Sequence, residues 1–171
     1  MSVPQALTRL EVIKAKIKTK ETIVKEIAAW RLKDRKIVFT NGCFDILHLG
    51  HIDYLSKAAD FGHALIVGVN SDDSVRRLRK GDSRPIQDEI SRSMMIASLH
   101  VVAAVVVFNE DTPYDLIKLI QPDVLVKGAD YKIEDIAGHD IVLARGGEVK
   151  LIDYLEGYST SGIEKKIRES F

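Results

Sequence analysis

Five short runs of apolar residues recur along the chain, and each is nearly continuous in Val, Ile, Leu and Ala rather than alternating with polar residues. Continuous apolar strands are typical of a parallel sheet that is covered on both faces. The runs that predict strands are "KIVFT" at 36–40, "ALIVGVN" at 64–70, "VVAAVVVF" at 101–108, "DVLVKG" at 123–128 and "EVKLID" at 148–153.

Helical patterns separate these runs, as expected if helices cover both faces of the sheet. The segments that predict helices are 50–61, 71–79, 88–100, 113–120 and 140–145. This alternation predicts an α/β fold with a Rossmann-like, open, five-stranded parallel sheet and right-handed crossovers. Ligands of such sheets bind beyond the carboxyl ends of the strands, where the strand order reverses. The residues that follow each predicted strand are therefore the first candidates for chemistry.

The first 30 residues carry a different pattern. Apolar residues recur there at helical spacing in two stretches: Leu7, Leu10, Ile13 and Ile17, followed by Ile23, Ile27 and Trp30. We predict a helical extension over 1–30, packed on the domain or on a partner subunit, and a single domain over 31–171. The intervening lysine run "KAKIKTK" is expected to be a solvated helix face or a linker rather than a phosphate site.

The amino-acid composition excludes several classes of partner and site. The 171 residues carry 25 basic and 25 acidic side chains, so no overall field draws the protein to nucleic acid or to an anionic membrane. The single cysteine excludes an internal disulfide and a multi-cysteine zinc site. Without an apolar stretch of about 18 residues or a secretory signal, we expect a cytoplasmic protein.

The stretch "TNGCFDILHLGH" follows the first predicted strand. Glycine there lets the backbone turn sharply and approach a ligand with its amides exposed, and the start of the next helix adds a positive end. A site of this kind favours a phosphate ligand. His48 and His51 would share one side of the first helical turn, where imidazole can donate a hydrogen bond to a phosphoryl oxygen.

Other interpretations of this stretch stay open. The two histidines could bind zinc, although further ligands are not evident, or they could simply cap a helix. Asp45 fits a structural acceptor that fixes the turn better than a general base. Cys43 fits a small packed residue better than a nucleophile, because nothing adjacent marks it as an activated thiolate.

A basic cluster, "NSDDSVRRLRKGDSRP", follows the second predicted strand. Such clustering in a neutral protein suggests a polyanion pocket. Arg76, Arg77 and Arg79 are also explained by the solvated face of a short helix. Lys80 and Arg84, on either side of "GDS", are better placed to reach phosphate, and Arg92 is expected to point inward from its helix.

"KGADY" follows the fourth predicted strand. Lys127 could offer a point charge to phosphate, while Gly128 and Asp130 could hold a ribose or a base edge. An ordinary turn from strand to loop explains the same residues.

"GYSTSGIEKKI" follows the fifth predicted strand and opens a helix with three hydroxyl side chains. Ser161 with Glu164 fits a capping box, which alone could account for the pattern. Because this helix starts at the same edge of the sheet, Ser159, Thr160 and exposed amides could instead cradle the outer phosphates of a nucleotide.

Together these stretches resemble a known superfamily. "GCFDILHLGH" resembles the HxGH motif of the nucleotidyltransferases, which include cytidylyltransferases and pantetheine-phosphate adenylyltransferase, and "YSTSGI" is similar to their ISSTxxR motif. The arginine that ends the second motif is not evident, and Lys165 or Lys166 would have to replace it. From Lys18 to Ile167 the amino-acid sequence resembles the adenylyltransferases of ADP-heptose synthesis in lipopolysaccharide core biosynthesis. The resemblance is to a stand-alone form without the kinase domain.

The resemblance implies adenylyl transfer from ATP, with Mg²⁺, to a sugar 1-phosphate by direct in-line attack, in a homodimer. No metal site built from protein side chains is expected. His48, His51 and Lys127 would be catalytic. The residues expected to bind the nucleotide or its phosphates are Thr40, Asn41, Gly42, Cys43, Phe44, Lys80, Arg84, Arg92, Gly128, Asp130, Ser159, Thr160 and Ser161.

Three alternative functions are also compatible with parts of this sequence. A cytidylyltransferase acting on glycerol 3-phosphate or a related phosphorylated alcohol would share the HxGH and STS stretches. A nucleotide-binding regulatory module would keep the pocket without turnover, although both histidines weigh against it. A flavodoxin-like carrier would need a hydroxyl-rich phosphate loop where "NGCFDILHLGH" stands.

Overall fold

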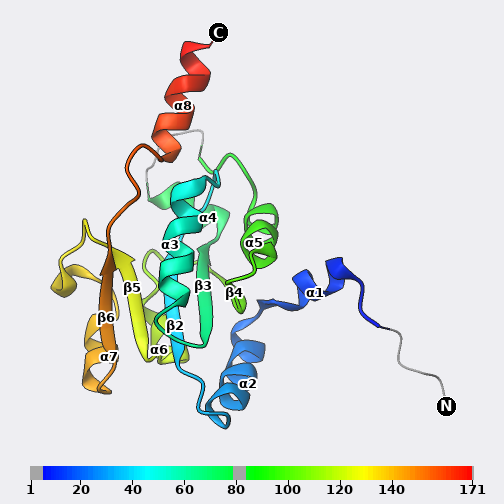
Figure 1. Ribbon diagram of the computed structural model, residues 1–171, viewed down its shortest axis with the longest axis vertical. Coiled ribbons are helices and arrows are strands. Elements are labelled where there is room, and N and C mark those ends of the chain that lie inside the picture. Colours follow the sequence, from blue (N-terminus) through cyan, green and yellow to red (C-terminus); the bar gives the residue numbers. More distant parts are fainter. Residues whose placement is uncertain (1–5, 79–83, 171) are drawn as a thin grey trace.

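The computed structural model describes residues 6–78 and 84–170 (Figure 1). Its strands are β1 (Ile17–Lys18), β2 (Ile37–Gly42), β3 (Ala64–Asn70), β4 (Ala104–Phe108), β5 (Val124–Gly128) and β6 (Glu148–Ile152). Its helices are α1 (Arg9–Ala15), α2 (Lys20–Arg31), α3 (Leu49–Ala59), α4 (Asp72–Arg77), α5 (Glu89–Ser98), α6 (Tyr114–Ile120), η1 (Ile133–Asp135), α7 (His139–Ala144) and α8 (Thr160–Glu169).

The strands form one parallel sheet in the order β1-β4-β3-β2-β5-β6. All five predicted strands are present, and the Rossmann-like α/β prediction is confirmed. The sheet has a sixth strand because Ile17, expected in a helix, is extended and pairs with Val105. Helix α1 ends just before it, and the amide of Val105 donates to the carbonyl of Lys16 at 2.9 Å.

Helices cover both faces of the sheet, as the continuous apolar strands predicted. One face packs against α2, α6 and α7, which contribute buried residues such as Ile27, Ile117 and Val142. The other face packs against α3 and α5, with Leu55 and Ile96 buried there. Helix α2 thus confirms that part of the N-terminal extension packs on the domain. Helix α1 contains no fully buried residue, but its half-buried Ile13 packs against the core on the α3–α5 face.

The strand order fixes where a ligand would bind. From β2 the chain proceeds outward through β3 to β4, and then returns to β5 and β6 on the other side of β2. The order therefore reverses between β2 and β5, whose carboxyl ends are Gly42 and Gly128. Two of the four stretches singled out in the sequence follow these two strands, and the reversal point is the expected ligand crevice. In the described part of the chain, no helix is long and apolar enough to cross a membrane.

Candidate active site

The turn after β2 is shaped by Gly42 and Phe44. Phe44 adopts a left-handed backbone conformation, with φ of 53°, and its side chain is buried. A Cβ at Gly42 would lie 3.0 Å from the Phe44 ring, so glycine leaves the room that the ring needs. Cys43 between them is half-buried, with its Sγ 3.9 Å from the side-chain oxygen of Asn70. The turn thus places its backbone at the carboxyl edge of the sheet.

His48 and His51 lie side by side directly beyond this turn. Their rings stack with centroids 3.9 Å apart and planes inclined by 26°, and the Phe44 ring meets His51 edge-on at 5.4 Å. His48 is the N-cap residue of α3, but its side chain makes no capping hydrogen bond. A Cβ at Gly50 would lie 3.0 Å from Nδ1 of His48, so the glycine admits the ring. The structure brings the histidines together as predicted and does not support simple helix capping.

Both imidazoles are kept neutral by their surroundings. Burial, together with a smaller effect of the nearby His48, lowers the pKa of His51 to about 4. Burial also lowers the pKa of His48. Nδ1 of each ring is buried and has no hydrogen-bond partner in the structure. Leaving a buried polar atom unpaired costs about 1–3 kcal/mol, which makes these rings receptive to a polar ligand.

Lys127 and Asn41 meet across the point where the strand order reverses. Nζ of Lys127, at the end of β5, donates to the side-chain oxygen of Asn41, near the end of β2. The same Nζ lies 5.5 Å from the ring centroid of Tyr131. Next to Asn41, the buried Thr40 shares a hydrogen bond of 2.8 Å with the hydroxyl of Tyr54 on α3. A cation therefore stands at the expected ligand crevice.

Gly128 and Asp130 have packing partners that the sequence did not predict. The hydroxyl of Tyr154, beyond β6, donates to Oδ1 of Asp130 at 2.9 Å. A Cβ at Gly128 would overlap the Tyr154 hydroxyl. A side chain at position 128 would therefore displace the Tyr154 hydroxyl and disturb its hydrogen bond to Asp130.

Arg92 points inward as predicted, but it does not offer its charge to the crevice. Its side chain is 0% exposed. It donates to the carbonyls of Gln87, Cys43 and Asn70 at 2.7–2.9 Å and to the carboxylate of Asp72 at 2.7 Å. The phosphate contact expected of Arg92 is not favoured by this arrangement. The guanidinium instead ties the turn after β2 to the end of β3.

Arg84 is also engaged by carboxylates rather than placed free for phosphate. It pairs with Asp45 at 2.6 Å and with Glu164 at 2.7 Å, and its side chain is 12% exposed. Asp45 in turn accepts hydrogen bonds from the amides of Ile86 and Gln87, both at 2.9 Å. Asp45 is therefore a structural acceptor, as predicted. Lys80, the other cation expected to reach phosphate from this segment, lies outside the described residues.

The STS stretch begins α8, but the predicted capping box is wrong. Ser159, not Ser161, is the N-cap residue, and its hydroxyl accepts from the amide of Gly162 at 3.0 Å. Glu164 pairs with Arg84 instead of closing a box. Thr160 and Ser161 lie in the first turn. This segment abuts the histidine turn, because a Cβ at Gly50 would lie 3.3 Å from Cβ of Tyr158.

Tyr54 and Tyr154 were missed, and each left a usable signal in the sequence. Tyr54 follows His51 by three residues, so both lie on one side of α3. Tyr154 follows the fifth predicted strand and therefore belongs to the same edge of the sheet. A tyrosine near a predicted site is too common to single out without that placement.

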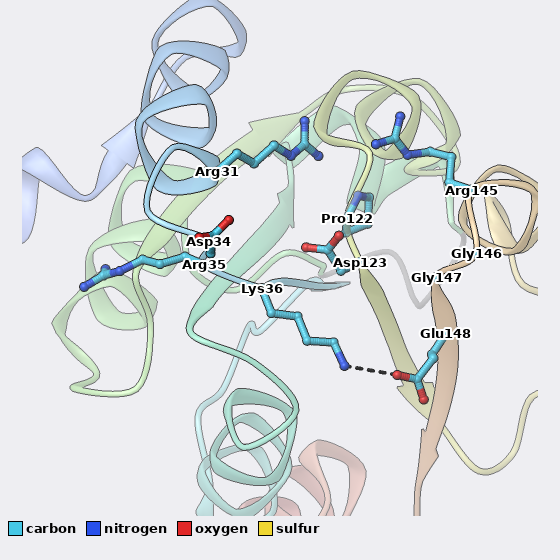
Figure 2. Close-up of a pocket in the computed structure, with 10 residues that line it drawn as sticks. All are labelled: Arg31, Asp34, Arg35, Lys36, Pro122, Asp123, Arg145, Gly146, Gly147 and Glu148. Atoms are coloured by element: carbon cyan, nitrogen blue, oxygen red, sulfur yellow. Dashed lines mark hydrogen bonds and ion pairs between the residues drawn. The ribbon is translucent and has the colours of Figure 1, made fainter.

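A pocket of about 610 Å³ opens at the opposite edge of the sheet (Figure 2). Its lining residues are Arg31, Asp34, Arg35, Lys36, Pro122, Asp123, Arg145, Gly146, Gly147 and Glu148. Arg31 donates to the carbonyl of Gln121, just past the end of α6, at 2.6 Å. Lys36 pairs with Glu148 at 3.0 Å. These charged side chains form hydrogen bonds and ion pairs at the ends of helices and at the starts of strands. The histidines lie at the other end of the strands, so we do not assign the reaction to this pocket.

Comparison with known sequences identifies the family. The profile of the cytidylyltransferase-like family matches residues 39–166. The bifunctional protein HldE of Wolinella succinogenes is 54% identical over 155 residues, which cover 91% of this chain and 32% of the relative. HldE of Campylobacter jejuni subsp. doylei is 53% identical over 154 residues, with 90% and 32% covered. The chain spans about a third of the length of these curated relatives.

Solved structures agree. A lipopolysaccharide core biosynthesis protein from Thermoplasma volcanium is 32% identical, with a TM-score of 0.59, over 73% of this chain and 99% of that one. Pantoate-beta-alanine ligase from Francisella tularensis, 16% identical with a TM-score of 0.57 over 90% of this chain and 77% of that one, shares the fold. The chain therefore belongs to the cytidylyltransferase-like family.

Proposed function

We propose that the protein transfers the adenylyl group of ATP to D-glycero-β-D-manno-heptose 1-phosphate. A phosphate oxygen of the sugar forms a bond to the α-phosphorus of ATP, the bond from that phosphorus to the bridging oxygen breaks, and pyrophosphate leaves. The observation that carries the proposal is the stacked pair His48 and His51, with unpartnered ring nitrogens, beside the glycine turn. The names of the relatives, HldE and a lipopolysaccharide core biosynthesis protein, support the choice of acceptor.

The histidines would act on the α-phosphate as neutral donors. With a pKa of about 4, His51 carries no charge near pH 7, and each neutral imidazole has one N–H to donate. Negative charge builds on the non-bridging oxygens as the attacking and leaving oxygens share the phosphorus. Hydrogen bonds that strengthen with this charge stabilise the transition state more than bound ATP.

No strong base is required for this reaction, because a phosphate monoester is already an anion near neutral pH. Positioning and electrostatics then supply most of the catalysis, as in other phosphoryl-type transfers. Lys127 would neutralise phosphate charge at the crevice between β2 and β5. The amides of Gly42, Cys43 and Phe44 would help to hold the α-phosphate, and the start of α8 at Ser159–Ser161 would receive the outer phosphates.

Magnesium fits this site as part of the bound nucleotide. In the described ranges, no group of three or more His, Cys, Asp and Glu side chains could hold a metal ion. Mg²⁺ usually keeps several waters and binds through substrate phosphates with few protein ligands, so it would arrive on ATP and neutralise the triphosphate. We also propose a homodimer located in the cytoplasm, where ATP is available. The exposed Leu7, just before α1, and Leu10, within it, are consistent with a subunit contact.

A substrate panel tests the proposed function. The protein is incubated with Mg²⁺, each nucleoside triphosphate in turn, and a set of sugar 1-phosphates and polyol phosphates, and pyrophosphate release is measured. We expect ATP with the heptose 1-phosphate to give the highest kcat/KM. Preference for CTP with glycerol 3-phosphate would identify a cytidylyltransferase instead. Nucleotide binding without turnover on any pair would identify a regulatory module.

A further inference from the structure

Helix α8 stands at the carboxyl edge of the sheet and has few ties to the rest of the protein. It contains no fully buried residue, and Figure 1 shows its far end pointing away from the other elements. Within residues 6–78 and 84–170, the ion pair between Glu164 and Arg84 is the only hydrogen bond or ion pair that joins α8 to another segment. The position of this helix therefore depends on that pair.

The guanidinium of Arg84 joins α8 to the histidine turn. One of its terminal nitrogens donates to Asp45 at 2.6 Å and the other to Glu164 at 2.7 Å. The side chains of Arg84, Asp45 and Glu164 are 12%, 5% and 25% exposed, so salt and water screen these contacts only in part. Asp45 lies three residues before His48, between the glycine turn and α3. The planar, forked guanidinium suits this bridge between two carboxylates better than the point charge of a lysine.

The Asp45 end of the bridge is fixed by the backbone. The amides of Ile86 and Gln87 both donate to the Asp45 carboxylate at 2.9 Å. Burial acts to raise the pKa of Asp45, but these amides and Arg84 outweigh it, so the pKa is lowered and the group stays ionised near pH 7. Among the residues that the structure describes, Glu164 has no partner other than Arg84. Arg84 therefore links the more exposed helix to a fixed point beside the histidines.

The charges of the bridge favour a positioning role over phosphate binding. With Tyr158–Ile163 matched to ISSTxx, Glu164 occupies the position at which that motif ends in arginine. This chain thus has an acid there, which binds an arginine from a distant segment. The two carboxylates together exceed the single positive charge of Arg84, so the bridge has no surplus cation to offer to an anion.

We infer that Arg84 is a positioning residue, which holds the start of α8 beside the histidine turn through Glu164 and Asp45. This inference rests on the proposed function, in which the histidines act on the α-phosphate and the start of α8 receives the outer phosphates. A triphosphate that spans both elements binds more tightly when their spacing is fixed before it arrives. Arg84 supplies this preorganisation without contacting the nucleotide.

Steady-state kinetics of Glu164→Ala test the inference, because this change breaks the link to α8 and leaves the pair between Arg84 and Asp45 in place. We expect KM for ATP to rise about fivefold, the scale of one partly exposed charged hydrogen bond, with kcat within about twofold of the parent. Because α8 contains no buried residue, the melting temperature should stay within about 2 °C of the parent. The matched control is Glu169→Ala, which removes the same charge from α8 but breaks only an exposed pair with Lys165, and all three values should be unchanged.

The double variant Arg84→Met/Glu164→Ala separates positioning from direct contact with the nucleotide. If Glu164 acts only through Arg84, KM for ATP of the double variant should equal that of Arg84→Met. Independent effects that multiply would overturn the inference. A raised KM in Arg84→Met with an unchanged or lowered KM in Glu164→Ala would overturn it too, because Arg84 would then bind phosphate directly. Lost activity with a melting temperature lowered by more than about 5 °C in Glu164→Ala would show that the pair stabilises the fold instead.

Hydrogen exchange of the α8 amides, measured without nucleotide, keeps this inference apart from the proposed function. We expect faster exchange over residues 163–167 in Glu164→Ala than in the parent, with unchanged exchange in the strands. Equal exchange in α8 of parent and variant overturns the positioning role, even if the parent turns over ATP and the heptose 1-phosphate. Faster exchange in the variant, together with a parent that turns over no nucleoside triphosphate, supports the link made by Arg84 and overturns the proposed function alone.

Discussion

We expect His48→Ala and His51→Ala each to lower kcat at least about a hundredfold, the scale for losing one preorganised donor at developing charge. Under the proposed mechanism the stacked rings would stabilise the transition state more than the ground state, so KM for ATP should change much less than kcat. Pyrophosphate release under saturating substrates measures the effect.

The control for the histidine variants is His100→Ala, because His100 is exposed and lies after α5, away from the pair. Its kcat should equal that of the parent. Rates of the His48 and His51 variants within a few-fold of the parent would remove both residues from the catalytic role. Loss of activity together with a lowered melting temperature would indicate that the rings are needed for packing with Phe44 instead.

We expect Arg92→Met to lower the free energy of unfolding by about 3 kcal/mol, within the range for removing one partner of a buried ion pair. The three carbonyls of Cys43, Asn70 and Gln87 lose their donors in the interior, and Asp72 loses its cation. For a domain of this size the melting temperature should fall by about 10 °C. Urea unfolding and thermal melting measure the loss.

Arg76→Met is the matched control for Arg92, because Arg76 pairs with Asp73 at an exposed position on α4. It should change stability by less than about 0.5 kcal/mol. If Arg92→Met leaves stability unchanged and instead raises KM for ATP, then Arg92 binds phosphate as its sequence position suggested. The structural role assigned here would then be wrong.

The fold could be predicted because each long strand carries its own signal. The runs that form β2 to β5 are apolar on both faces, and core residues such as Phe39 and Val38 belong to clusters on opposite sides of the sheet. Strand β1 has only two residues, Ile17 and Lys18, which is too short to show any periodicity. Its pairing with β4 depends on contacts about 90 residues apart, which no local pattern encodes.

The histidine pair could be predicted because its geometry is local. A glycine turn and two histidines three residues apart define their own arrangement at the start of α3. The roles of the basic side chains were harder to predict, because a sequence shows that a residue is charged but not which residues it pairs with. Arg84 is engaged by Asp45 and Glu164, and those two carboxylates come from distant segments.

The central claim is that the paired imidazoles of His48 and His51 hold the α-phosphate. Histidine-ring NMR across a pH titration, with and without Mg²⁺ and a non-hydrolysable ATP analogue, tests it most directly. Without nucleotide, His51 should stay neutral down to a pKa of about 4. An anionic phosphate beside the ring favours the protonated form, so binding should raise this pKa and shift the ring resonances of both histidines. If the analogue binds while both histidines titrate unchanged, the claim is contradicted.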